Sequence, residues 1–295
     1  MTTVVAETET KAIGGSPRAR AWRRFRRHRA ATAGIAVLLL IVLSTLFGPL
    51  FIAARPDAQD LALGPVGPAA GHPFGTDYEG RDLLVRTLIG GRISLLVGLV
   101  ATLVSLVIGV TVGALAGYHG GRIDNLLMRF VDVLYGLPYM FFVIVLMVWL
   151  GRSLINVFIG LGAVSWLTMA RIVRGAVLSL RRQEFVLAAE CAGAGPTAII
   201  LRHILPNALG PIVVYATLTV PRVMIEEAFL SFVGLGVQPP LATWGSLIAD
   251  GSALYREYPW LLAFPSAFFV ATLLALNFIG DGLRDAIDPR GEGGR

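Results

Sequence analysis

The sequence has 295 residues, of which 55% are hydrophobic and only 15% are charged, whereas a soluble globular domain carries about 25% charged residues. This composition and several long apolar runs exclude an ordinary soluble protein and predict an all-α integral membrane protein. The net charge of +6 comes almost wholly from arginine, since Lys11 is the only lysine. The basic residues are spread over short loops and one tail, which suits a membrane surface better than nucleic acid.

Residues 1–29 are polar and end in the basic sequence "RAWRRFRRHR", directly before an apolar run at 30–54. Paired arginines before an apolar stretch are typical of a twin-arginine export signal and also of a signal-anchor helix. The run is too long for the apolar part of a signal peptide and further spans follow it, so the anchor is the favoured interpretation. We therefore expect a cytoplasmic tail at 1–29 and the first transmembrane helix at 30–54.

Further apolar segments follow, and with the first they give six spans, which predicts that both termini lie in the cytoplasm. We expect an extracytoplasmic loop at 55–92, a transmembrane domain of five spans at 93–282 and a cytoplasmic tail at 283–295. The loops alternate, so 172–207 is predicted inside and 234–258 outside. The five predicted spans are 93–118, 128–150, 154–171, 208–233 and 259–280.

Small residues recur at every fourth position of the second predicted span. On a helix this spacing places them on one face, which another helix can approach closely. Packing within the chain is the simpler interpretation, and contact with a partner membrane chain is the alternative. The residues of this helix-packing face are Ala101, Ser105, Gly109, Gly113 and Gly117.

The sequence lacks the motifs of several kinds of active site. A phosphate-binding loop G-x-x-x-x-G-K-[ST] is excluded because the only lysine, Lys11, has a different context, so we expect no ATP or Mg site in this chain. Cys191 is the single cysteine and the four histidines are scattered, so we expect neither a disulfide nor a metal site. No G-x-S-x-G motif occurs, and no catalytic residue is predicted. An ion gradient or a separate ATPase must then drive any active transport.

The polar segment 184–207, "EFVLAAECAGAGPTAIILRHILPN", separates the fourth and fifth predicted spans. Good helix formers at 187–190 predict a short helix, and Gly193 suits the left-handed position after its end. A second short helix is predicted from Pro196, with Pro206 marking its end before the next span. The result is a cytoplasmic helix–glycine–helix elbow. From periodicity alone, an interfacial re-entrant loop is an equally good interpretation.

The elbow resembles the cytoplasmic signature of permease subunits of ABC importers, E-A-A-x-x-x-G-x₉-I-x-L-P. The alanines, the glycine and the final Leu-Pro pair of that pattern are present, whereas Leu187 replaces its acidic residue and His203 replaces its isoleucine. The resemblance implies that this segment couples the chain to an ATPase. The residues of this coupling elbow are Glu184, Ala188, Ala189, Glu190, Ala192, Gly193, Leu205 and Pro206.

Longer stretches resemble the dipeptide, oligopeptide and nickel permease family of these importers. They are "HPFGTDYEGRDLLVRTLIGGRISL", "EEAFLSFVGLGVQPPLATWGSLIADG" and "NFIGDGLRDAIDPR", and with the elbow they cover most of 72–290 in order. The extra N-terminal span and the long loop after it point to the second of the family's two permease types. The resemblance implies the type I ABC importer permease fold, with six transmembrane helices and a cytoplasmic coupling elbow.

The same resemblance implies the partners. They are a second homologous permease chain, two ABC ATPase subunits that bind ATP and Mg, and an extracytoplasmic solute-binding protein, all at the cytoplasmic membrane of a prokaryote with the lipid bilayer around the spans. Short peptides are the expected substrate. A nickel or nickel-chelate importer is the alternative within the family, and a gradient-driven secondary transporter is the alternative from another class.

Charged and aromatic residues within the predicted spans are candidates for the translocation path. A carboxylate inside a membrane is costly and usually functional, and it would suit the amino terminus of a peptide. For Glu226 the alternative is an i,i+4 pair with Arg222, and the tyrosines are more often packing residues or interface anchors. The candidates are Asp132, Tyr135, Tyr139, Glu226 and Glu227.

Overall fold

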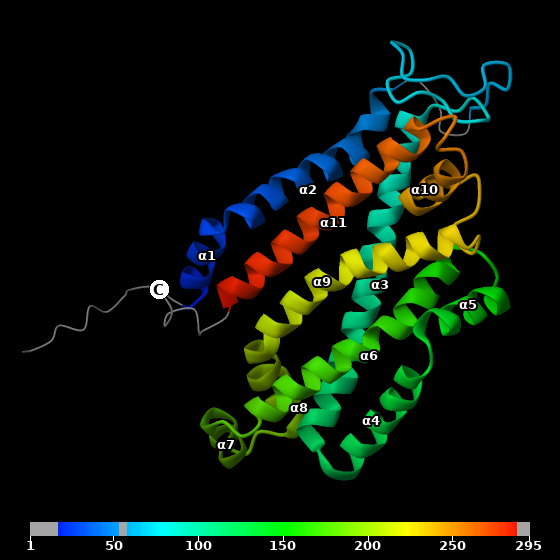
Figure 1. Ribbon diagram of the computed structural model, residues 1–295. Helices are drawn as coiled ribbons and strands as arrows, with labels where there is room; N and C mark the ends of the chain where they lie inside the picture. Colours follow the sequence, from blue (N-terminus) through cyan, green and yellow to red (C-terminus); the bar gives the residue numbers. More distant parts are fainter. Residues whose placement is uncertain (1–16, 53–57, 288–295) are drawn as a thin grey trace, which may run out of the picture.

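The computed structural model describes residues 17–52 and 58–287, which form a bundle of long helices (Figure 1). No β-strand forms in these ranges, and two isolated bridges, Ala69–His72 and Thr76–Asp82, lie in the loop before the second span. The predicted tails fall outside the described residues at 1–16 and 288–295, and the predicted loop 55–92 does so at 55–57.

The helices have the following bounds. They are α1 Pro17–Arg27, α2 Arg29–Phe47, α3 Leu83–His119, α4 Gly121–Gly136, α5 Tyr139–Leu150, α6 Leu154–Leu180, α7 Glu184–Cys191, α8 Pro196–Ala198, α9 Leu205–Phe232, α10 Trp244–Ala253 and α11 Trp260–Ile287. A 3₁₀ turn at Gly48–Leu50 follows α2, and a π-helical turn at Ile199–Ile204 joins α8 to α9.

The described residues give six spans when one broken helix pair counts as a single span. Five helices are long and apolar enough to cross a membrane, namely α2, α3, α6, the continuous helix Pro196–Phe232 and α11. The sixth span, counted in this way, is the pair α4 and α5, which meet at 84°. The segment predicted as one span at 128–150 is therefore bent between these two helices. Pro138 lacks a backbone N–H and forces Leu137 into an extended conformation, with φ −77° and ψ 138°.

α3 begins at Leu83, so this helix extends into the segment predicted as the loop 55–92. The Asp82 carboxylate caps the helix, because its Oδ1 accepts a hydrogen bond from the Val85 backbone N–H at 3.0 Å. Arg86 in the first turns is buried and donates to the buried Asp77. The helix can begin within a polar stretch because these charges are paired. α6 and α11 likewise continue past their predicted ends, to Leu180 and Ile287.

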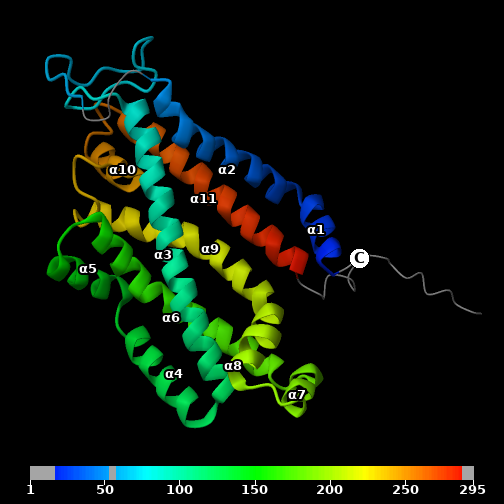
Figure 2. The same cartoon turned by 180° about the vertical axis from the view of Figure 1, so that it is seen from behind.

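α3 and α6 form the centre of the bundle and run alongside each other (Figure 2). The small-residue face of α3 is buried and directed at α6. A methyl group on Gly109 would lie 2.6 Å from Met169 Cβ, and one on Gly113 would lie 2.5 Å from the Ala170 carbonyl oxygen. The face that the sequence predicts thus contacts a helix of the same chain.

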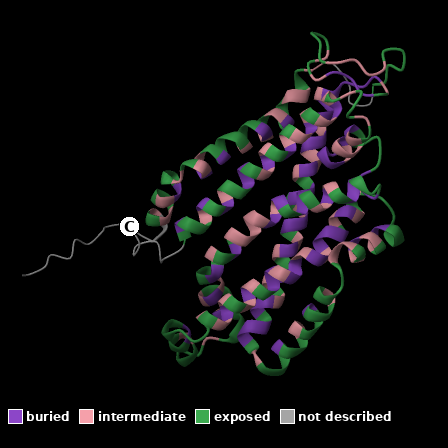
Figure 3. Ribbon diagram, viewed as in Figure 1, coloured by how far each residue is buried: buried purple, intermediate pink, exposed green. Residues whose placement is uncertain are grey.

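α2 and α11 lie side by side, and α1 packs across their ends (Figure 1). Phe25 of α1 is buried against Ala31 and Ala286. α9 crosses between this pair and the α3–α6 pair, because it contacts α3, α6 and α11. Apolar side chains remain exposed along α2 and α5 (Figure 3), as expected for helices that face lipid.

Candidate functional site

The coupling elbow begins with the short helix α7, which ends in a complete Schellman motif. Gly193 has φ +82° and its N–H donates to the Glu190 carbonyl at 2.9 Å, while the Ala194 N–H donates to the Ala189 carbonyl at 3.0 Å. Only glycine adopts this left-handed conformation without strain. The chain therefore turns sharply at Gly193, as the sequence predicts, before α8 begins at Pro196.

The second half of the elbow is continuous with α9, so the prediction that Pro206 ends a separate helix is wrong. The helix runs unbroken from Pro196 to Phe232. Just before Pro206 it widens into a π-helical turn, in which the Leu205 N–H bonds to the Ile200 carbonyl. A proline ring clashes with the carbonyl four residues earlier in a regular α-helix. The wider π turn displaces that carbonyl and lets the helix pass through Pro206.

α7 projects from the bundle with most of its surface exposed (Figure 3). Val186 is its one buried residue and packs in a cluster with Ile199, Ile204 and Val177. Glu190 is exposed but its Oε1 accepts a hydrogen bond from the Tyr118 hydroxyl of α3 at 3.4 Å. The elbow is thus anchored to the bundle along one side only. Of its predicted residues, Ala189 and Leu205 are half-buried, and Glu184, Ala188, Glu190, Ala192, Gly193 and Pro206 are exposed.

A second candidate site is a polar face that crosses α4, α6 and α9. On α4, Asp132 forms an ion pair with Arg171 of α6 at 2.7 Å, although their side chains are 63% and 40% exposed. The Arg171 guanidinium also stacks over the Tyr135 ring, with 4.0 Å between its carbon and the ring centroid. Asp132 and Tyr135, predicted from the sequence, therefore share one partner, Arg171, which the sequence analysis did not single out.

The polar face continues where α5 meets α9. Tyr139 donates a hydrogen bond from its hydroxyl to Glu226. Arg222 donates from Nε to the other oxygen of Glu226 at 2.9 Å, so the i,i+4 pair weighed as an alternative does form. The Arg222 side chain is 52% exposed. Charged groups are costly in contact with lipid, so this exposed face within the spans must meet water or another protein.

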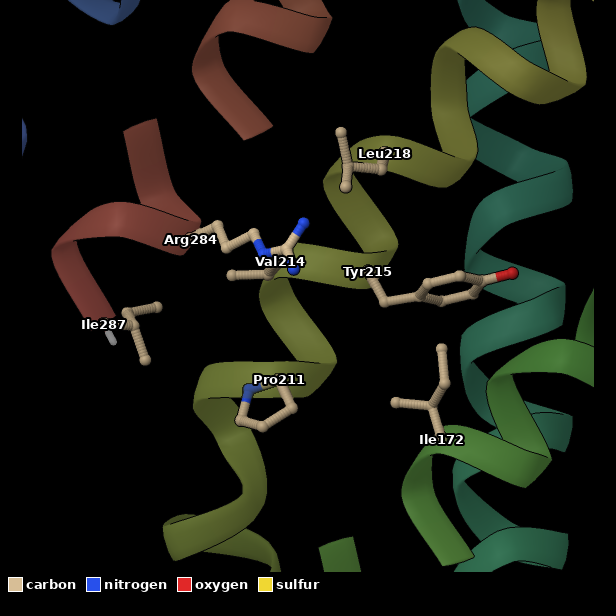
Figure 4. A pocket seen from close by; sticks show the side chains of 7 residues that line it. All are labelled: Ile172, Pro211, Val214, Tyr215, Leu218, Arg284 and Ile287. Atoms are coloured by element: carbon tan, nitrogen blue, oxygen red, sulfur yellow. The ribbon is translucent and has the colours of Figure 1, made fainter. Parts of the chain in front are cut away.

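A groove of about 480 Å³ is lined by residues of α6, α9 and α11 (Figure 4). Its α9 residues Pro211, Tyr215 and Leu218 precede Arg222 at intervals of four, three and four, so all four share one face of the helix. Among the described residues, Arg284 of α11 is its only charged lining residue. The groove and the polar face thus form one continuous surface along α9. The remaining lining residues are Ile172, Val214 and Ile287.

Glu227 lies apart from this surface. Its side chain is 1% exposed and faces α10, where it accepts hydrogen bonds from Ser231 Oγ and Thr243 Oγ1, both at 2.8 Å. The structure therefore separates Glu227 from the other four predicted path residues. No local sequence pattern separates Glu227 from Glu226, because adjacent residues on a helix point about 100° apart and only the position of α10 decides which is covered. Within the described ranges, 17–52 and 58–287, no three His, Cys, Asp or Glu side chains lie close enough together to hold a metal ion.

Comparison with known proteins places this geometry in a family. Residues 109–292 match the model of the binding-protein-dependent transport system inner membrane component, and residues 16–65 match the N-terminal TM domain of oligopeptide transport permease C. The oligopeptide transport system permease protein OppC of Escherichia coli K12 is 51% identical over 91% of this chain and 89% of its own length.

Two further comparisons agree with this assignment. The dipeptide transport system permease protein DppC of Bacillus subtilis 168 is 45% identical over 92% of this chain and 85% of its own length. Among solved structures, a chain of the MetNI methionine ABC transporter in an inward-facing conformation matches with a TM-score of 0.57 and 20% identity, over 68% of this chain and 96% of that one. The fold is therefore that of a type I ABC importer permease, and the chain belongs to the family of binding-protein-dependent transport system inner membrane components.

Proposed function

We propose that this chain is one of two permease subunits that together form the path for short peptides through an ATP-driven importer of the cytoplasmic membrane. The observation that carries the proposal is the polar face, whose charged side chains are exposed within the spans and therefore need water or a partner chain over them. Family membership and the peptide permeases among its relatives support the same function. These relatives do not favour nickel import or gradient-driven transport.

In this proposal the second permease covers the polar face, and the substrate passes between the two chains. Asp132, Tyr135, Tyr139 and Glu226 belong to the path, and the groove beside Arg284 is its end nearest the elbow. The face presents both carboxylates and guanidinium groups, and a peptide with free termini carries both charges. An extracytoplasmic binding protein delivers the peptide at the opposite end, near α10.

The elbow is proposed as the docking site of one of the two ATPase subunits, which bind ATP and Mg. Small side chains are exposed at Ala188 of α7 and at Ala192, its C-cap, and they leave room for a surrounding cleft. α7 also stands on a continuous helix that reaches through the membrane. A movement imposed on α7 is therefore passed to α9 and the polar face, which is how ATP binding would open and close the path. The elbow and both termini lie on the cytoplasmic side, and loop 58–82 lies outside.

The test is uptake of a labelled peptide into vesicles that hold this chain, the second permease, the ATPases and the binding protein. Asp132→Asn keeps the shape of the side chain but leaves Arg171 without its carboxylate. We expect uptake to fall about tenfold, or about 1.4 kcal/mol on the barrier, with assembly unchanged. Glu257→Gln, at an exposed carboxylate outside the spans, is the matched control. Uptake by the wild type without ATP, or an unchanged rate in Asp132→Asn, would contradict the proposal.

A further inference from the structure

The short helix α10 is fixed against the spans by its first residues. Trp244 is fully buried, and its ring N–H donates to the Thr87 carbonyl of α3 at 2.8 Å. The backbone N–H of Trp244 donates to Ser94 Oγ, also of α3, at 2.9 Å. On its other side, Asp250 of α10 lines one small pocket together with Asp77 of loop 58–82. α10 thus lies between that loop and the spans.

Glu227 connects α10 to α9. Thr243 is the N-cap of α10, and its hydroxyl donates to Glu227 Oε1 while also accepting from the Ser246 N–H at 3.0 Å. Ser231 donates to the same oxygen. Glu227 Oε2 has no hydrogen-bond partner, and no arginine lies within ion-pair distance among the described residues. A buried carboxyl that makes only these contacts is costly, so its place depends on the two hydroxyl groups.

The backbones of α9 and α10 also meet at this point. A methyl group on Gly245 would lie 2.6 Å from Ala228 Cα and 3.0 Å from Glu227 Oε2. No larger residue fits at Gly245 unless the two helices move apart. The hydrogen bond from Thr243 to Glu227 and this close approach therefore hold the start of α10 and the end of α9 as one unit, which we call the Glu227 latch.

The opposite end of the same helix is the coupling elbow. The helix continues without a break from Pro196 in the elbow to Phe232, one turn beyond Glu227. At about 1.5 Å per residue, its 37 residues extend over about 55 Å, enough to cross the membrane. One continuous helix thus has the Glu227 latch near one end and the proposed ATPase docking site at the other.

We propose that Glu227 is a positioning residue that transmits a conformational change along α9 to the coupling elbow. The change starts when the peptide-loaded binding protein docks on loop 58–82 and α10. This inference rests on the proposed function, since it assumes a binding protein on one side and ATPases on the other. Glu227 needs only an acceptor oxygen for this role and no negative charge. The role therefore differs from that of a residue in the translocation path.

The test compares two near-isosteric variants in the reconstituted transporter. Glu227→Gln keeps an oxygen that accepts both hydroxyl groups, and Glu227→Met removes it. We expect stimulation of ATP hydrolysis by the peptide-loaded binding protein to fall about tenfold in Glu227→Met, within the usual range for coupling between distant sites. Glu227→Gln should keep most of it. Assembly and basal ATP hydrolysis should stay near wild-type values in both, which a general loss of structure would not allow.

A double-mutant cycle identifies the contact itself. Thr243→Val should lower stimulation like Glu227→Met, and combining the two should add little beyond the loss of the α10 cap at Thr243, because both remove the same contact to Glu227. Ser252→Ala is the matched control, since that hydroxyl on α10 bonds only to Ala249 of its own helix. If Glu227→Met fails to assemble, the loss of stimulation in Thr243→Val tests the same contact.

Three results would decide against the Glu227 latch. They are normal stimulation in Glu227→Met and Thr243→Val, additive effects of the two, or a loss in Glu227→Gln as large as in Glu227→Met. In all three the wild type still takes up peptide, so the proposed function stands. A wild type that is not stimulated by a peptide-loaded binding protein would instead overturn the proposed function, and this inference with it.

Discussion

Gly193 is the residue on which the shape of the elbow depends. Its φ of +82° lies in the left-handed region, and that conformation allows the two hydrogen bonds that close the end of α7. No atom outside its neighbours lies within 4 Å of the position that a β-carbon would occupy. The requirement for glycine is therefore conformational and not steric, so backbone strain can be tested there without a change in packing.

Gly193→Val should strain the turn by about 1–2 kcal/mol. That is too little to unfold the packed spans but enough to misdirect a helix of two turns. We expect the variant to reach the membrane and pair with the second permease, yet to retain less ATPase in a pull-down. Gly195→Val is the matched control, because Gly195 has equal space around it and an ordinary φ of −72°. Equal ATPase recovery from both variants would show that the turn does not position the docking surface.

At the scale of elements, the contact between α3 and α6 decides how closely the central helices approach. Gly109, Gly113 and Gly117 all face α6 at distances where an added methyl group would overlap it. Close approach of this kind favours helix association in membranes, because apolar side chains gain little by leaving lipid. Packing density in the bundle therefore depends on residues that have no side chain.

Gly113→Ala should lower the stability of the bundle by about 1–3 kcal/mol, as overpacking does, because its methyl group would meet the Ala170 carbonyl oxygen at 2.5 Å. Gly175→Ala on the exposed side of α6 meets nothing within 4 Å and should stabilise the helix by about 0.5–1 kcal/mol. Thermal unfolding of the purified chain in detergent measures both. The packing argument fails if the two variants shift the midpoint in the same direction.

For the whole molecule, six spans, with α4 and α5 counted as one, predict that the elbow and loop 58–82 lie on opposite sides of the membrane. The chain carries its own reporter of this arrangement, since its single cysteine, Cys191, is exposed at the end of α7. Leu61 is 74% exposed in the loop at the other end of the bundle. A thiol at either position is accessible to a reagent that does not cross the membrane, but only from its own side.

Native Cys191 should react with such a reagent only in inside-out vesicles. Leu61→Cys, in a Cys191→Ser background, should react only in right-side-out vesicles or intact cells. The Cys191→Ser chain without a new thiol sets the background. Reaction of both positions from the same side would rule out six spans between the two ends of the chain.

Sequence periodicity predicts the six spans and the glycine turn because both depend on local residue properties. The start of α3 at Leu83 has no such local signal, since the charges around its first turns are neutralised by partners that only the folded loop brings together, such as Asp77 for Arg86. The continuation of the helix through Pro206 depends on a π-helical turn, which no sequence pattern predicts. The different surroundings of Glu226 and Glu227 depend on where α10 lies, and that is a property of the tertiary structure.

The exposed polar face also has a consequence for biogenesis. A copy of this chain that is inserted before its partner would expose Asp132, Arg171 and Arg222 to acyl chains instead of a protein surface. We therefore expect the cellular lifetime of this chain to depend on how fast its partner is synthesised, so that unpaired copies are degraded rather than accumulated.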